Sequence, residues 1–226
     1  MNNKNDASSG NAIIIILIGI FLFAFLTFAV TQNSRQDQSS LSKEQARLKA
    51  AEIIQYASDL RIAVNRVIAY GGGDDTAINF AHPSANAAYG TYGTTPKNEV
   101  FNPAGGGAIW QGPPAAANDG SAYEFLGRMK ITGIGQGVAA AGAELTITLF
   151  ALDSLVCSQI NKILSTGWTS IPVNAGTITT TRFAGTYTDG DTVVGTGAEL
   201  TGKYGFCFRE GAGGQRYIFT YVLRAR

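Results

Sequence analysis

An uninterrupted apolar run near the N-terminus constrains the fold of this chain more than any other feature. Residues 13–30 are eighteen consecutive positions without a charged or strongly polar side chain. As a helix, the run is about 27 Å long, which is enough to cross the hydrocarbon core of a bilayer. Its Ile, Leu, Phe and Val residues together favour insertion by about 6 kcal/mol. We therefore predict a transmembrane helix over residues 11–30, anchored by Ile13, Ile16, Leu17, Ile20, Phe21, Phe25 and Val30.

Two other interpretations of this run fit the sequence less well. A buried core helix of a soluble protein needs a polar face, and this run has none. A cleaved secretory signal has an apolar region of about 7 to 15 residues that ends in an A-x-A-like site. The nearest match to such a site is residues 27–29, which read TFA. A helix that is retained in the mature protein is the better interpretation.

A short polar leader, residues 1–10, precedes the run. It reads MNNKNDASSG, ends in Gly10 and is followed by Asn11 and Ala12. In this arrangement the chain resembles type IV pilins and pseudopilins, whose leader is cut after a glycine on the cytoplasmic side. The resemblance implies that Gly10 is the last leader residue and Asn11 the new N-terminus. It also implies that the apolar helix stays intact and serves filament assembly.

The chain departs from the pilin pattern at the start of the mature sequence. Major pilins carry glutamate at the fifth mature position, where this chain has Ile15, and they begin with Phe or Met rather than Asn. No carboxylate is therefore present to neutralise the terminal amine of a neighbour inside an apolar bundle. This departure fits a minor or divergent subunit better than an ordinary shaft subunit.

A second helical segment follows, within residues 31–70. Ser42 and Gln45 have the spacing of a capping box, and Gly71 begins a triple glycine that ends the helix. Apolar residues alternate at spacings of four and three between them: Ala46, Ala50, Ile53, Ala57, Leu60, Val64 and Val67. We expect Ile53, Leu60, Val64 and Val67 to pack on a sheet. Residues 31–40 either join both segments into one rod of about 90 Å or form a hinge, and both alternatives stay open.

The remaining residues, 71–226, are expected to form an extracytoplasmic α+β domain. Residues 71–120 are rich in Pro and Gly and predict loops, in which Phe101 and Trp110 either pin the loop to the core or anchor a partner. Strands are predicted over 123–134, 144–150, 204–209 and 215–223, with a short helix over 153–164. The last strand is apolar on both faces, which places it inside a sheet with a helix above it. The predicted fold is a long N-terminal helix packed on a small antiparallel sheet, with one short helix and long loops.

The two cysteines lie on different predicted elements. Cys157 falls on the short helix and Cys207 on the first strand of the C-terminal hairpin. A disulfide between them would clamp helix to sheet and stabilise the fold by about 4 kcal/mol, since it closes a segment of about 50 residues. Pilins are similar in having a C-terminal disulfide. Two inert buried thiols are the alternative.

Signals for the membrane orientation conflict. Four basic residues follow the apolar run within about 20 residues, whereas the leader offers only Lys4, so the positive-inside rule favours a cytoplasmic C-terminal domain. The cysteine pair and the Gly/Thr-rich β region are more typical of an oxidising exterior, and long domains are translocated regardless of nearby charge. We expect the inner membrane before assembly, with the domain extracytoplasmic, and the cell surface as an extracellular filament afterwards.

Composition and motifs argue against chemistry and nucleic-acid binding. Seventeen Lys and Arg against sixteen Asp and Glu give a net charge of +1, without a basic cluster in the middle of the chain. His82 is the only histidine, and two cysteines cannot supply a tetrahedral zinc site. Asp74, Asp75, Asp189 and Asp191 lack EF-hand spacing. Four arginines near the C-terminus either protect an edge strand or dock on an acidic face. We expect no enzyme, cofactor or metal.

The function that fits best is a structural subunit of a type IV pilus-like or pseudopilus filament, assembled through the apolar helix. Its expected partners are copies of itself or other pilin-like subunits, together with membrane lipid. The alternative is a single-pass membrane-anchored binding or adhesion domain that forms no filament and meets an unknown extracellular ligand. An enzyme is the third hypothesis, and no convergent polar constellation supports it.

Overall fold

The structure is a computed structural model. It describes residues 9–135, 142–164, 166–188, 190, 192–193, 200–211 and 216–226, with the side chains of all these residues except 9–13, 26 and 28–41. The chain divides into two compact units, Met1–Gln45 and Ala46–Arg226.

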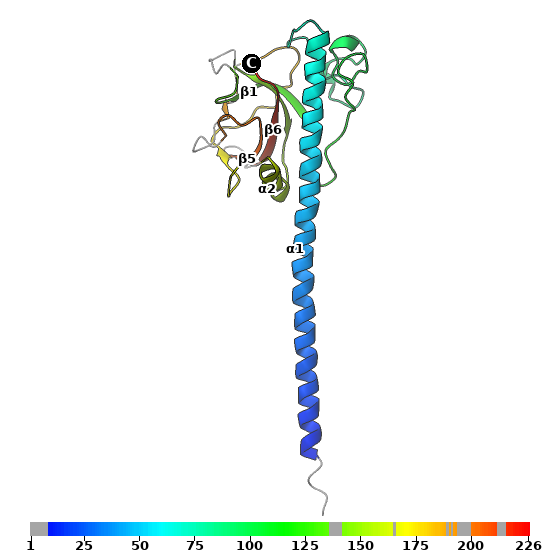
Figure 1. The fold of residues 1–226 in the computed structure, drawn as a ribbon, viewed down its shortest axis with the longest axis vertical. Coiled ribbons are helices and arrows are strands. Elements are labelled where there is room, and N and C mark those ends of the chain that lie inside the picture. The colour runs from blue at the N-terminus through cyan, green and yellow to red at the C-terminus, as the bar shows by residue number, and fades with distance from the viewer. Residues whose placement is uncertain are drawn as a thin grey trace, which may run out of the picture. The chain divides into compact units, whose positions relative to one another are not determined.

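One long helix, α1, runs from Ser9 to Tyr70 (Figure 1). It includes residues 31–40, where a hinge was the alternative expectation. The triple glycine ends α1 as predicted, because Gly72 and Gly73 take φ values of 91° and 84° that other residues rarely adopt. Amides beyond the last turn bond back to the helix, from Gly71 to the Val67 carbonyl and from Gly73 to the Ile68 carbonyl.

The second unit contains a six-stranded sheet with the order β3-β5-β6-β2-β1-β4. The strands are β1 Glu124–Ile131, β2 Glu144–Leu149, β3 Val173–Asn174, β4 Thr192–Val193, β5 Gly205–Glu210 and β6 Tyr217–Arg224. The four central strands are antiparallel, as predicted. The two outer strands pair in parallel, so the complete sheet is mixed. Both strands have only two residues. A segment this short cannot show the alternation of apolar and polar residues that predicts a strand from the sequence.

Each face of this sheet is covered by a different part of the second unit. On one face, the apolar residues of α1 between Ala46 and Val67 pack against the sheet. The strand residues in this contact include Phe125, Leu145, Ile147, Leu149 and Phe219. The four residues expected on this contact, Ile53, Leu60, Val64 and Val67, are all buried there. On the opposite face, β6 packs with Ile178, Leu200 and the partly buried Trp168, which all precede β5 in the chain. Because both faces of the sheet are buried, β6 carries apolar side chains on both of its faces.

A short helix, α2, spans Ser154–Ile163 and is joined to β5. Asp153 caps its N-terminus by accepting hydrogen bonds from the amides of Leu155 and Val156. The predicted disulfide joins Cys157 of α2 to Cys207 of β5, and both residues are buried. The fold is α+β with a long helix on an antiparallel sheet centre, one short helix and long loops, as expected from the sequence.

The loop segment 71–123 is tied to the core of the second unit. It contains two short 3-10 helices, Ala87–Tyr89 and Pro96–Asn98. Buried Glu99 organises the segment by accepting hydrogen bonds from the amides of Gly93 and Thr95 and from the side chain of Asn102. Phe101 is buried and meets the Trp110 ring at 5.0 Å between centroids. Of the two alternatives for these aromatic residues, pinning the loop to the core is the one observed.

Candidate interaction surfaces of α1

The first part of α1 carries apolar side chains on every side of the helix. Ten large ones between Ile14 and Phe25 are 54% to 76% exposed in the described structure, and they include Ile16, Leu17, Ile20, Phe21 and Phe25 of the predicted anchor. Ile13 and Val30 of that anchor lie outside the residues whose side chains are described. The hydroxyl of Thr27 donates to the carbonyls of Phe23 and Ala24, so it does not interrupt the apolar surface with an unsatisfied donor.

The predicted processing site lies at the start of α1. Gly10 and Asn11 both belong to the helix, while residues 1–8 of the predicted leader lie outside the described residues. Within the part of the chain that the structure describes, no helix combines the length and the apolar character that crossing a membrane requires.

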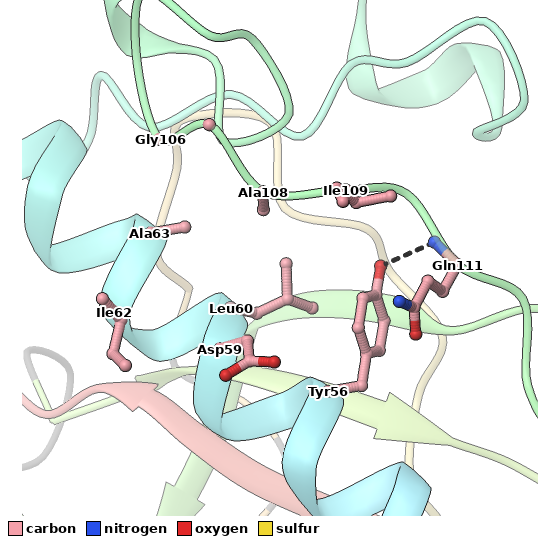
Figure 2. Close-up of a pocket in the computed structure, with 10 residues that line it drawn as sticks. Tyr56, Asp59, Leu60, Ile62, Ala63, Gly106, Ala108, Ile109 and Gln111 are labelled. Carbon is pink, nitrogen blue, oxygen red and sulfur yellow. Dashed lines mark hydrogen bonds between the residues drawn. The ribbon is translucent and has the colours of Figure 1, made fainter.

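A groove of about 290 Å³ lies beside α1 in the second unit (Figure 2). One wall is α1, with Leu60 and Ala63 buried at its base, and the other wall is the backbone of residues 106–111. Two large aliphatic residues stand at its edges, Ile62, which is 66% exposed, and Ile109, which is 75% exposed. These two residues were not singled out by the sequence. An aliphatic residue on the polar face of an otherwise regular amphipathic helix is the signal that marks Ile62.

The glycines at 105–107 shape the loop wall of this groove. A Cβ atom on Gly106 would come within 2.4 Å of the Val100 carbonyl oxygen, and one on Gly105 would lie equally close to the Glu99 oxygen. At Gly107, φ is +68°. Larger residues at these positions would therefore push the loop away from its present path.

Three polar side chains line the groove, those of Tyr56, Asp59 and Gln111. The hydroxyl of Tyr56 accepts a 3.2 Å hydrogen bond from the amide of Gln111, as Figure 2 shows. Burial raises the pKa of Tyr56 to about 12, against a smaller opposing effect of this bond, so the phenol is neutral at physiological pH. Asp59 is exposed and accepts a 2.8 Å hydrogen bond from the side chain of Gln55. The groove thus offers an apolar base and an anionic edge.

A second surface lies on the opposite flank of α1. The guanidinium of Arg61 stands 5.1 Å from the centre of the Tyr204 ring. Tyr204 is 43% exposed. The end of α2 lies beside it, since Cδ1 of Leu164 would be 3.4 Å from a Cβ atom on Gly205, and the preceding Ile163 is 37% exposed. Asp59 and Arg61 are two residues apart, which turns their side chains by about 200° around the helix. This flank is therefore separate from the groove and carries the opposite charge.

No protein-family model, no curated protein and no solved structure matches this chain.

Of the other groups considered for chemistry, Asp74, Asp75 and His82 have structural partners. Asp74 accepts from the amide and hydroxyl of Thr76, and Asp75 forms an ion pair with Arg226 at 3.0 Å. Asp189 and Asp191 lie outside the described residues. His82 stacks on Trp110 and accepts a hydrogen bond from the Ser84 amide.

Two further observations bear on acid–base and metal chemistry. Partial burial lowers the pKa of His82 and so favours its neutral imidazole. Among the described residues, no group of three His, Cys, Asp or Glu side chains is arranged to hold a metal ion.

Proposed function

We propose that this chain is a structural subunit of a type IV pilus-like or pseudopilus filament that assembles through the apolar part of α1. The observation that carries the proposal is the set of ten large apolar side chains between Ile14 and Phe25, exposed on all sides of one helix. Burying each of them stabilises an assembly by about 1.5 to 3 kcal/mol. Exposed apolar surface of this extent favours a lipid or protein neighbour.

The second unit supports the proposal through its architecture. A long helix packed on an antiparallel sheet, closed by a disulfide near the C-terminus, is a pilin-like arrangement. The disulfide also indicates an extracytoplasmic domain, because such bonds persist in oxidising compartments. Together with the leader that ends in Gly10, these features favour a pilin-like role.

The absence of a glutamate at the fifth mature position favours a minor or divergent subunit. Ile15 occupies that position and is among the exposed apolar residues. Helices of this chain would contact one another through apolar packing alone at that level. Its partners are then copies of itself or other pilin-like subunits, with membrane lipid around the helix before assembly.

A second candidate is a membrane-anchored extracytoplasmic binding or adhesion domain that forms no filament. The groove beside α1 favours it, since about 290 Å³ is close to the size at which small-molecule sites begin. This candidate predicts chains that stay in the membrane fraction.

Electron microscopy of material sheared from the producing cells separates the two candidates. An antibody against the second unit is expected to label filaments along their length or at their ends. Labelling confined to the membrane fraction, with no filament in the sheared material, would contradict the proposed function and favour the anchored domain.

A further inference from the structure

We infer that the groove beside α1 receives the Arg61–Tyr204–Ile163 surface of a second copy of this chain, in a head-to-tail contact. The inference rests on the proposed function and names the contact that would order the second units along a filament. The proposed contact has two halves. One is the groove, on which Asp59, Ile62 and Ile109 are the contacting residues. The other is a surface that we call the basic flank, defined by Arg61, Ile163 and Tyr204.

Apolar side chains favour contact on both halves. Ile62 and Ile109 stand largely exposed at the edges of the groove, above a base of buried Leu60 and Ala63. On the basic flank, Tyr204 and Ile163 are also partly exposed. Tyrosine and arginine are enriched in interface anchors, and a tyrosine ring of this exposure suits the apolar base of a shallow groove.

The charges of the two halves are complementary. Asp59 and Glu52 are exposed on the groove side of α1, where Arg66 lies at the far end beside Gly107. The basic flank has Arg61, exposed Lys162 at the end of α2 and half-buried Lys203 beside Tyr204. Arg61 lies over the Tyr204 ring, which holds its guanidinium near the surface where it can bond a carboxylate.

The positions of the two halves disfavour a symmetric pairing through the groove. A two-fold contact through the groove would bring Asp59 of one copy towards Asp59 of the other, and like charges facing each other are unfavourable. Because the groove and the basic flank lie about 200° apart around α1, one copy can use both at once. A contact of this kind continues from copy to copy and produces a filament if it does not close into a ring.

The contact is small, and this suits a role that depends on the apolar helix. A stable independent interface buries about 800 Å² on each partner, more than a single groove with two edge residues provides. Bundling of the apolar helices would raise the local concentration of the second units, so that a weak contact is sufficient to set their register.

Cross-linking of the full chain tests the inference directly. The chain has only two cysteines, and both are in the buried disulfide, so Ile109→Cys and Ile163→Cys would add the only free thiols. In filaments of the double variant, a short bismaleimide is expected to produce a ladder of dimers, trimers and larger species. A mixture of the two single variants should stop at dimers, and each single variant alone should give none.

Three results would overturn the inference. Dimers from the Ile109→Cys variant alone would show a symmetric contact through the groove. Normal filaments of the double variant without any cross-link would place the contact elsewhere while leaving the proposed function intact. If the unaltered chain forms no filament, the proposed function fails and the inference fails with it.

Charge variants provide a second readout that does not depend on cysteines. Asp59→Lys and Arg61→Glu are each expected to lower the amount of filament by about tenfold. The double variant Asp59→Lys/Arg61→Glu exchanges the charges of the two halves and is expected to restore it. Failure of the double variant to recover, when it folds with an intact disulfide, would contradict the pairing.

Discussion

The side-chain amide of Asn161 pairs with the backbone of Cys207 through two hydrogen bonds. The amide nitrogen donates to the Cys207 carbonyl and the amide oxygen accepts from the Cys207 N–H, both at 2.8 Å. The partner of Cys207 in the disulfide is Cys157, one turn earlier on the same helix. Asn161 therefore takes the place of a neighbouring strand at the middle of β5, where backbone groups would otherwise lack partners.

Replacing Asn161 with alanine is expected to destabilise the second unit by about 2 to 6 kcal/mol. The substitution leaves both backbone groups of Cys207 buried and unpaired, and each such group costs about 1 to 3 kcal/mol. Thermal unfolding of the full chain in detergent measures the change, with the exposed neighbour Lys162→Ala as the matched control. Equal midpoints for the two variants would show that the paired amide contributes little.

Reduction of the disulfide is expected to lower the free energy of unfolding by about 4 kcal/mol. The bond joins residues separated by 50 positions, and this loop is released in the unfolded chain when the bond is broken. The double variant Cys157→Ala/Cys207→Ala should show the same loss without reductant. Unchanged unfolding of either form would mean that α2 and β5 are held by the Asn161 pair and apolar packing alone.

Glu144 is expected to make the second unit less stable as the pH rises. The side chain is buried, and desolvation raises its pKa from 4.5 to about 7, although Lys130 and a hydrogen bond from the Ile131 amide oppose the shift. The folded chain therefore binds a proton between about pH 4.5 and 7 that the unfolded chain has lost. The free energy of unfolding should fall across this window by about 3 kcal/mol.

The matched variant for this prediction is Glu144→Gln, which keeps an oxygen for the Ile131 amide and carries no charge. Unfolding curves at several pH values between 4 and 8 are expected to show a smaller decline for the variant than for the unaltered chain. Parallel declines would assign the pH dependence to other groups.

A pair of substitutions in the apolar helix tests the pilin resemblance. If Asn11 is the mature N-terminus, then Ile15→Glu places a carboxylate at the fifth position, where it can neutralise the terminal amine of a neighbour. Ile16→Glu places the same charge one residue later, where that partner is missing. Burial of this unpaired charge in an apolar environment is unfavourable by about 3 kcal/mol. We expect filaments from the Ile15→Glu variant and a marked loss from Ile16→Glu in sheared material. Equal losses would contradict the assignment of the N-terminus.

Regular periodicity made the helices and the central strands predictable. The apolar residues from Ala46 to Val67 are spaced alternately by four and three positions, and this spacing predicts a helix with one buried face. The strand that contains Ile218 and Phe219 is apolar on both faces, which predicts a central place in a sheet. The cysteine pair also predicted that the short helix lies beside the first strand of the C-terminal hairpin, which the disulfide confirms. These features depend on burial, which leaves a direct pattern in the sequence.

Features that depend on long-range packing left no such pattern. The groove arises because residues 106–111 pass α1 at a distance set by glycine contacts with Glu99 and Val100. The buried position of Glu144 also depends on segments far away in the chain. Its place at the start of β2 gave no indication that its carboxylate would be enclosed.

Two of the four C-terminal arginines have a role that neither sequence alternative named. Arg216 pairs with the buried carboxylate of Glu210, and Arg226 pairs with Asp75. β6 lies between β5 and β2 rather than at an edge, so protection of an edge strand is not the role of these residues. Both arginines fasten elements of the second unit to one another.

The proposed function requires that the apolar helix stays on the mature chain and holds it among its neighbours. Whether the helix is retained can be read from the intact mass of the protein isolated from sheared filaments or membranes of the producing cells. We expect a mass that lacks residues 1–10, with Asn11 as the first residue and the disulfide formed. A mass that lacks residues 1–29, from material that is monomeric and free in solution, would contradict it.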